Sequence, residues 1–293
     1  MRAFVTGGAG FVGRRLGPRL ESEGYDVVSV DQEVDITDPE ALAGAMAAAS
    51  PDVVAHLAAQ SSVARSWQDP ASCFRVNYLG TLHVLRAMQQ HCPTARLLFV
   101  SSGDTYGSRS PGSAPCREFE PLSPRSPYAQ SKAAAERLAC SAAEQGLDVV
   151  CTRSFNHTGA GQSDDFVASS FARRLADMEK GQAEEVLPVG NLDSVRDFLD
   201  VDDVIDAYVQ LLRRETPAGV YNVASGRPVR IREILDLLLE LSPAEPEVKV
   251  DPTRVRPSDY LVGDPSLLVR TTGWKPRTPL KRTLGKLLDA WRH

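Results

Sequence analysis

A glycine-rich segment between an apolar strand and a helix constrains this chain most. The segment reads AFVTGGAGFVGRRL, in which residues 3–6 predict a strand and the residues after Gly10 predict a helix. Gly7 is placed to make the turn, Gly10 to let the backbone approach a pyrophosphate, and Gly13 to let the helix pack on the strand. The pyrophosphate would then meet the free N–H groups of the helix N-terminus. The segment therefore predicts a parallel α/β sheet that binds a dinucleotide.

Short apolar strands alternate with helical stretches over the first half of the chain. The expected strands are 3–6, 26–30, 52–56, 96–101 and 147–152, and the expected helices are 11–23, 39–48, 70–91 and 127–145. This alternation predicts a doubly wound parallel sheet with helices on both faces and a ligand crevice beyond the carboxyl ends of the strands.

The pattern loosens after Arg153. A loop is expected at 154–165, a helix at 166–180 and another from Asp202, followed by a small C-terminal part. We therefore expect a dinucleotide-binding domain over 1–153, with sheet contributions from later segments. Residues 154–293 are expected to form mainly a smaller substrate-binding lobe.

Composition excludes several classes of protein. The chain has 293 residues, 42% of them apolar and 24% charged, with a net charge of −5. That balance provides no basic surface for nucleic acid. The five cysteines lack the spacing of a zinc site or a disulfide framework, so no metal is expected. The sequence begins on a strand and no apolar run approaches the length of a membrane span, so we expect a cytoplasmic protein that does not contact membranes.

The choice between the two nicotinamide dinucleotides depends on the end of the second strand. Asp31 ends YDVVSVD, where a carboxylate would bind the adenosine ribose and favour NAD over NADP. Arg14 and Arg15 follow the last glycine of the loop and would partly tolerate a 2′-phosphate. NADH and NADPH therefore both remain candidate cofactors.

Tyr128 and Lys132 form the main catalytic signal. They are four residues apart in SPYAQSK, on one face of a predicted helix, so the ammonium can lower the pKa of the phenol. Such a tyrosine can donate or accept a proton. Ser101 and Ser102 end an apolar strand where the crevice should open, and Ser102 is the better candidate to hold a substrate carbonyl oxygen.

The helices expected at 70–91 and 127–145 carry apolar residues on more than one face. A homodimer interface would explain this width, and deep burial within one chain is the alternative.

Four motifs, GGAGFVG, HLAAQ, SSGDTYG and YAQSK, resemble in this order the extended short-chain dehydrogenase/reductase superfamily of nucleotide-sugar enzymes, which has a Rossmann-type fold. The resemblance implies that Ser102 is catalytic, that Tyr128 is the acid/base and that Lys132 is its partner and a ribose ligand. It further implies cofactor contacts at Gly7, Gly10, Phe11, Val12, Gly13, Asp31, Asp35, Ile36, Leu57, Ala58, Ala59 and Asn77.

Three later segments are similar to the GDP-4-dehydro-6-deoxy-D-mannose reductases and the GDP-mannose 4,6-dehydratases. They are RSFNHTGAGQ, GNLDSVRDFLDVDDV and RPSDYLVGDPSLLVRTTGWKP. By this resemblance Asn156 touches the sugar or the first phosphate, Val189 contributes to the substrate site, and Arg196 and Arg256 clamp the diphosphate. Ala160 departs from the proline that the family usually has there.

Two observations favour a reductase over a dehydratase. The position of the dehydratase carboxylate holds Asp104, one methylene shorter than the usual Glu, and DQEVDITD is short and acidic where dehydratases hold NADP with a longer basic segment. We expect NAD(P)H-dependent reduction of the 4-keto group of a nucleotide-linked 6-deoxysugar, GDP-4-dehydro-6-deoxy-D-mannose to GDP-D-rhamnose. Asp104 would orient the sugar or assist an acid/base step.

Several alternatives remain open at this stage. A 4-epimerase or a 4,6-dehydratase with bound NAD(P)⁺ would use the same groups without net oxidation. A non-catalytic nucleotide-binding sensor is a more remote alternative. The nucleotide base and the stereochemistry at carbon 4 also remain open, because loops 104–126 and 154–165 decide how the sugar lies.

Overall fold

A six-stranded sheet forms the centre of the structure, a computed structural model that describes residues 1–254 and 259–293. Its strand order is β10-β5-β4-β3-β1-β2, and every neighbouring pair is parallel. The strands are β1 (Arg2–Thr6), β2 (Asp26–Val30), β3 (Val53–His56), β4 (Arg96–Ser102), β5 (Asp148–Ser154) and β10 (Gly219–Val223). The order reverses between β1 and β3, and ligands bind beyond the carboxyl ends of the strands at such a point. The predicted fold class is confirmed.

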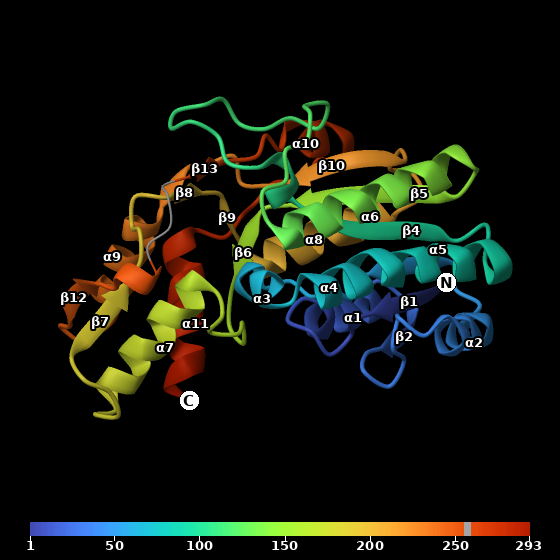
Figure 1. The fold of residues 1–293 in the computed structure, drawn as a ribbon. Coiled ribbons are helices and arrows are strands. Elements are labelled where there is room, and N and C mark those ends of the chain that lie inside the picture. The colour runs from blue at the N-terminus through green and yellow to red at the C-terminus, as the bar shows by residue number, and fades with distance from the viewer. Residues whose placement is uncertain (255–258) are drawn as a thin grey trace.

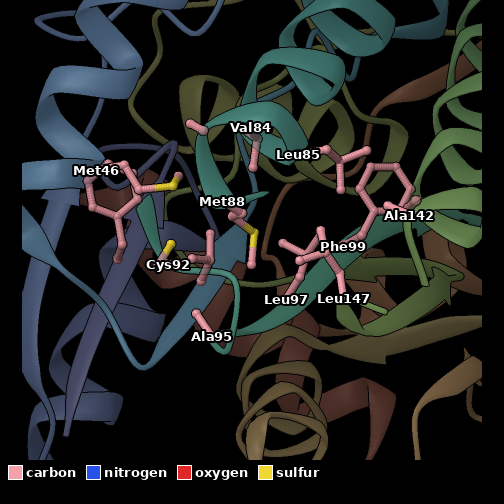
Figure 2. Close-up of a cluster of buried hydrophobic side chains, with 14 of the residues drawn as sticks. Met46, Val84, Leu85, Met88, Cys92, Ala95, Leu97, Phe99, Ala142 and Leu147 are labelled. Carbon is pink, nitrogen blue, oxygen red and sulfur yellow. The ribbon is translucent and has the colours of Figure 1, made fainter. Parts of the chain in front are cut away.

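One face of the sheet is covered by α2 (Pro39–Ala49), α5 (Gly80–His91) and α6 (Pro127–Glu144). Figure 2 shows part of this core, with Met46, Val84, Leu85, Met88, Cys92, Ala95, Leu97, Phe99, Ala142 and Leu147 labelled. Burial of each large apolar side chain contributes about 1.5–3 kcal/mol. This face therefore anchors α6, the helix that carries Tyr128 and Lys132.

The opposite face is covered by α1 (Gly13–Ser22), α8 (Val201–Leu212) and α10 (Ser266–Thr272). Successive side chains of β1 alternate between the two faces of the sheet, so Phe4 packs in the core of the first face, whereas Ala3 and Val5 pack in the core of this face. Helices α8 and α10 and strand β10 come from beyond residue 153, so the later chain returns to the sheet.

The single helix predicted over 70–91 is wrong, because this stretch consists of three consecutive segments. They are α4 (Pro70–Phe74), a π-helical turn η1 (Arg75–Leu79) and α5. A further short helix, α3 (Val63–Gln68), precedes them and was not predicted. Helical periodicity in the sequence does not distinguish an α-turn from a π-turn, and π-turns are frequent at functional sites.

A smaller lobe lies to one side of the sheet (Figure 1), with α7 (Val167–Glu179), α9 (Ile231–Leu241) and α11 (Leu280–Arg292) packed on one another around a separate apolar core. The other elements of the described chain are η2 (Gly103–Tyr106), β6 (Asn156–Thr158), β7 (Val186–Val189), β8 (Val195–Arg196), β9 (Phe198–Asp200), β11 (Val229–Arg230), β12 (Glu247–Val250), η3 (Pro252–Arg254) and β13 (Tyr260–Leu261). Among the described residues, the short strands form one three-stranded and two two-stranded sheets.

Most of the apolar width of the helices over 70–91 and 127–145 is used inside the chain. Val84, Met88 and Ala139 are buried in the core of the first face, whereas Leu79 stays 41% exposed. Trp67 on α3 is 58% exposed. In the described part of the chain, no helix has the length and apolar character needed to cross a membrane.

Candidate active site

A cavity of about 1140 Å³ opens beyond the carboxyl ends of β1, β3 and β4. Its walls come from the glycine-rich segment, the ends of these strands, α6, and the segment 154–168 that leads into the smaller lobe. Segments far apart in the sequence therefore meet at the point where the strand order reverses.

The glycine-rich segment is packed too closely for side chains at two positions. A Cβ on Gly7, which has φ of 73°, would lie 2.7 Å from the Ala58 nitrogen, and a Cβ on Gly13 would lie 2.2 Å from the Gly7 oxygen. The chain can thus bring backbone N–H groups and the start of α1 to the cavity, as a pyrophosphate site requires. Gly10, Phe11 and Val12 line the cavity beside them.

The end of the cavity beside β2, where the ribose is expected, is acidic. Asp31, Asp35 and Ile36 line it, and the Asp31 Oδ2 accepts a 2.9 Å hydrogen bond from the Ala9 N–H. Arg14 and Arg15, which the sequence offered as partners for a 2′-phosphate, donate to the carbonyls of Gly161 and Ala160 instead. Neither arginine lines the cavity beside Asp31.

The cofactor segment after β3 is held by a buried amide. Leu57, Ala58 and Ala59 line the cavity. The Asn77 side chain accepts from the Gln60 N–H at 2.8 Å and donates to the Gln60 carbonyl at 3.1 Å. Its amide also donates to Ser131 Oγ at 2.9 Å, so Asn77 connects this segment to α6 from behind the cavity wall.

The three predicted catalytic side chains meet in the cavity. Helix α6 begins after Ser126, whose hydroxyl accepts from the Ala129 N–H, and this start aims Tyr128 and Lys132 inward. Ser102 at the end of β4 lines the cavity with Tyr128 and acts to lower the pKa of its phenol. The Lys132 ammonium lies 5.1 Å from the centre of the Phe99 ring.

Burial, more than the spacing of the two residues, controls the protonation of this pair. Burial raises the pKa of Tyr128, the Asp104 charge raises it further, and the Ser102 hydrogen bond lowers it. Burial also lowers the pKa of Lys132 to about 8. The shift of the Tyr128 pKa is therefore upward, opposite to the lowering expected from Lys132.

Asp104 follows Gly103, a position with little room for a side chain. A Cβ on Gly103 would lie 3.0 Å from the Phe155 ring, tighter than ordinary contacts. Burial raises the pKa of Asp104, whereas the Arg196 charge lowers it. Arg196 also lines the cavity and binds the Asp259 carboxylate. Its positive charge therefore interacts with two carboxylates, those of Asp104 and Asp259.

The predicted substrate residues differ in where they lie. Asn156 lines the cavity, next to His157, whose ring stacks on Phe11 with centroids 6.2 Å apart. Val189 ends β7 with its side chain in the core of the smaller lobe. Arg256 lies outside the described residues.

Two buried polar atoms along the cavity belong to residues that the sequence analysis did not choose as site residues: Gln60 was not singled out, and Ser101 was ranked below Ser102. Within the part of the chain that the structure describes, Gln60 Oε1 and Ser101 Oγ have no hydrogen-bond partner. Both residues line the cavity. Buried polar atoms are normally paired, so these two fit a polar ligand such as the dinucleotide or the sugar. The sequence signal for these residues is their position: Gln60 follows the buried strand β3, and Ser101 lies at the end of the buried strand β4.

Comparison with known proteins identifies the family. The sequence profile of the NAD dependent epimerase/dehydratase family matches residues 3–224. The chain is 40% identical over 295 residues to the GDP-6-deoxy-D-mannose reductase of Pseudomonas aeruginosa, covering 99% of this chain and 97% of that protein.

Solved structures agree with this. RMD from Pseudomonas aeruginosa complexed with NADPH superposes with a TM-score of 0.92 and 38% identity, covering 99% of this chain and 98% of that one. The UDP-glucose 4-epimerase of Thermus thermophilus in complex with NAD gives a TM-score of 0.89 and 32% identity, covering 100% and 99%.

Proposed function

This chain belongs to the NAD-dependent epimerase/dehydratase family, and we propose that it reduces the carbon-4 ketone of GDP-4-dehydro-6-deoxy-D-mannose to give GDP-D-rhamnose, using NADH or NADPH. The observation that carries this proposal is the meeting of a buried Tyr128 with Ser102 and Lys132 in a cavity that the glycine-rich segment also lines. The 40% identity to a GDP-6-deoxy-D-mannose reductase over nearly the whole of both chains supports the substrate.

Tyr128 is the proton donor in this proposal. Reduction of a ketone needs a proton at the oxygen as the alkoxide develops, and a tyrosine whose pKa is raised by burial and by Asp104 holds that proton ready. The reductive direction therefore needs no prior loss of a proton from Tyr128.

Ser102 and Lys132 complete the oxyanion environment. Ser102 lines the cavity with Tyr128, and its hydroxyl can donate to the same ketone oxygen that Tyr128 protonates. Lys132 places a positive charge in the buried cavity, which stabilises the developing negative charge on that oxygen. When bound, the reduced nicotinamide supplies the hydride for carbon 4.

The carboxylates of the site argue against a dehydratase. Elimination of water between carbons 5 and 6 needs a base for the proton and an acid for the leaving hydroxyl. Among the described residues, Asp104 is the acidic side chain whose charge acts on Tyr128. Phe155 leaves no room for a second carboxylate at position 103 without displacement of its ring. One carboxylate suits an orienting role toward the sugar.

The substrate end is proposed to use Asn156, Arg196 and Arg256. Asn156 can hydrogen-bond the sugar or the first phosphate from the cavity wall. The guanidinium of Arg196 keeps donors beyond those that bind Asp259, so it can hold phosphate oxygens. For Val189 we propose a supporting role through the backbone of β7, since its side chain is enclosed in the lobe core. In this division, residues 1–153 serve the dinucleotide and 154–293 mainly the nucleotide sugar.

We also propose a cytoplasmic homodimer. The free cysteines of the described chain, four of them buried, suit a reducing compartment. Exposed Trp67 and Leu79 supply apolar surface beside the helices expected to form the dimer face. Light scattering of the purified protein tests the dimer, and a monomer at micromolar concentration would refute it.

The test of function follows NADH and NADPH by absorbance. The substrate is generated in place from GDP-mannose by a separate dehydratase, and the Tyr128→Phe variant serves as the control. Consumption that requires both the ketosugar and Tyr128 is expected. No consumption beside an active dehydratase would refute the proposal, and interconversion of UDP-sugars by protein with bound NAD⁺ would establish the epimerase alternative instead.

A further inference from the structure

Two loops that serve different ligands are joined by a stack of side chains. The glycine-rich segment carries Phe11, and the segment that carries Asn156 continues through His157 to Gly161. The Phe11 and His157 rings are nearly parallel, at 6° with centroids 6.2 Å apart. We call residues 156–161 the substrate segment. The Phe11 ring therefore packs against this segment through His157.

Arg15 makes a second contact between the two segments. Its guanidinium lies 4.8 Å from the centre of the Phe11 ring and donates to the Phe11 carbonyl at 3.0 Å. The same group donates to the carbonyl of Ala160. One side chain thus binds the glycine-rich segment and the substrate segment at once.

The substrate segment has little freedom to move independently of these contacts. Gln162 braces it from within, because its side chain donates to the His157 carbonyl at 2.9 Å and accepts from the Thr158 hydroxyl at 2.6 Å. A Cβ on Gly159 would lie 2.8 Å from Val201, so the turn also packs closely on α8. A shift of the Phe11 backbone would consequently be felt at Asn156.

We propose that Arg15 is a positioning residue that couples the two ligands, so that the dinucleotide bound at the glycine-rich segment raises the affinity of the cavity for the diphosphate of the nucleotide sugar. This rests on the proposed function. A pyrophosphate held by the N–H groups near Phe11 fixes that backbone, and the ring and Arg15 carry the constraint to the loop beside Asn156. The second ligand then orders less chain when it binds.

A matched control lies on the same helix. Arg19 is also on α1 and makes ion pairs with Glu23 and Asp206, away from both loops. Arg15 itself is only partly buried, with 26% of its side chain exposed, and its ion pair with Asp202 is long at 3.7 Å. Substitution of either arginine should therefore leave the protein folded.

The experiment measures binding by calorimetry with GDP as the probe, without turnover. GDP is titrated into wild type, Arg15→Met, Arg15→Lys and Arg19→Ala, each with and without saturating NADH. In wild type and Arg19→Ala, NADH should tighten GDP binding by about fivefold or more, in the usual range of coupling between sites. In Arg15→Met the factor should fall below about twofold while NADH alone binds as in wild type, and Arg15→Lys should lie between.

The outcomes separate this inference from the function beneath it. Wild-type coupling in Arg15→Met, or equal loss of coupling in Arg19→Ala, would overturn the role of Arg15. An unchanged melting temperature beside lost coupling would exclude a merely structural effect. If GDP fails to bind wild type even with NADH, the proposed GDP-linked substrate is refuted, and with it this inference.

Discussion

Asp31 should make the protein prefer NADH to NADPH. One carboxylate oxygen is occupied by the Ala9 N–H at 2.9 Å, which fixes the group at the ribose end of the cavity. The neighbouring Asp35 adds negative charge, while Arg14 and Arg15 are engaged with the 160–161 carbonyls. A 2′-phosphate would therefore meet like charge, and these two arginines are not placed to balance it.

The size of the preference follows from Coulomb's law. Unit charges about 5 Å apart interact by about 1 kcal/mol in water and by about 3 kcal/mol at an effective dielectric constant of about 20. Asp31 is partly exposed, so the lower part of that range applies. We expect a penalty of about 1–2 kcal/mol, which corresponds to about 5–30-fold weaker binding of NADPH.

The assay is a titration of both reduced dinucleotides at two salt concentrations. Asp31→Asn keeps an acceptor for the Ala9 N–H but removes the charge, so its preference should fall to within about twofold. Asp26→Asn, at the opposite end of β2 beside Arg2, is the control and should keep the wild-type ratio. High salt should reduce the ratio. Equal or tighter binding of NADPH by wild type would refute the reasoning, as would an unchanged ratio in Asp31→Asn.

Three further predictions concern the catalytic and structural side chains. Tyr128→Phe should lower turnover by about 10²–10⁴ without changing NADH affinity, and wild-type turnover would contradict its role as proton donor. The rate of ketone reduction should fall as pH rises through about 8, because the buried Lys132 loses its proton there; a pH profile level for more than a unit above that value would contradict this. Glu136→Gln should destabilise the fold by about 3–5 kcal/mol in denaturant titrations, because it leaves the buried Arg153 without its ionic partner. The control Glu144→Gln changes an exposed residue of the same helix and should have little effect. Equal effects of the two substitutions would count against the ion pair.

Local sequence was sufficient for five of the six strands of the central sheet, all except β10, because these strands and their helices are patterned by burial. The strands predicted at 3–6 and 26–30 match β1 and β2 to within a residue. The glycines were equally informative, since Gly7 and Gly13 leave no space for a Cβ. These constraints act within a few residues, so the sequence displays them directly.

Several features of the site could not be predicted because they depend on contacts between distant segments. The π-turn that presents Asn77 to Gln60 and Ser131 looks like ordinary helix in the sequence. The destination of Arg15 is set by a carbonyl 145 residues away. Neither partner is encoded near the residue that needs it.

The sequence by itself predicted the parallel strands, the close-packed glycines and the proposed proton-transfer pair, because strand periodicity, glycine and the i to i+4 spacing are local properties. Only the tertiary structure decided the direction of the pKa shifts of that pair and the partners of Arg14 and Arg15. Burial and the Asp104 charge raise the pKa of Tyr128, opposite to the lowering expected from Lys132 alone. Desolvation depends on everything that packs around a group, and that becomes defined only when the whole chain has folded.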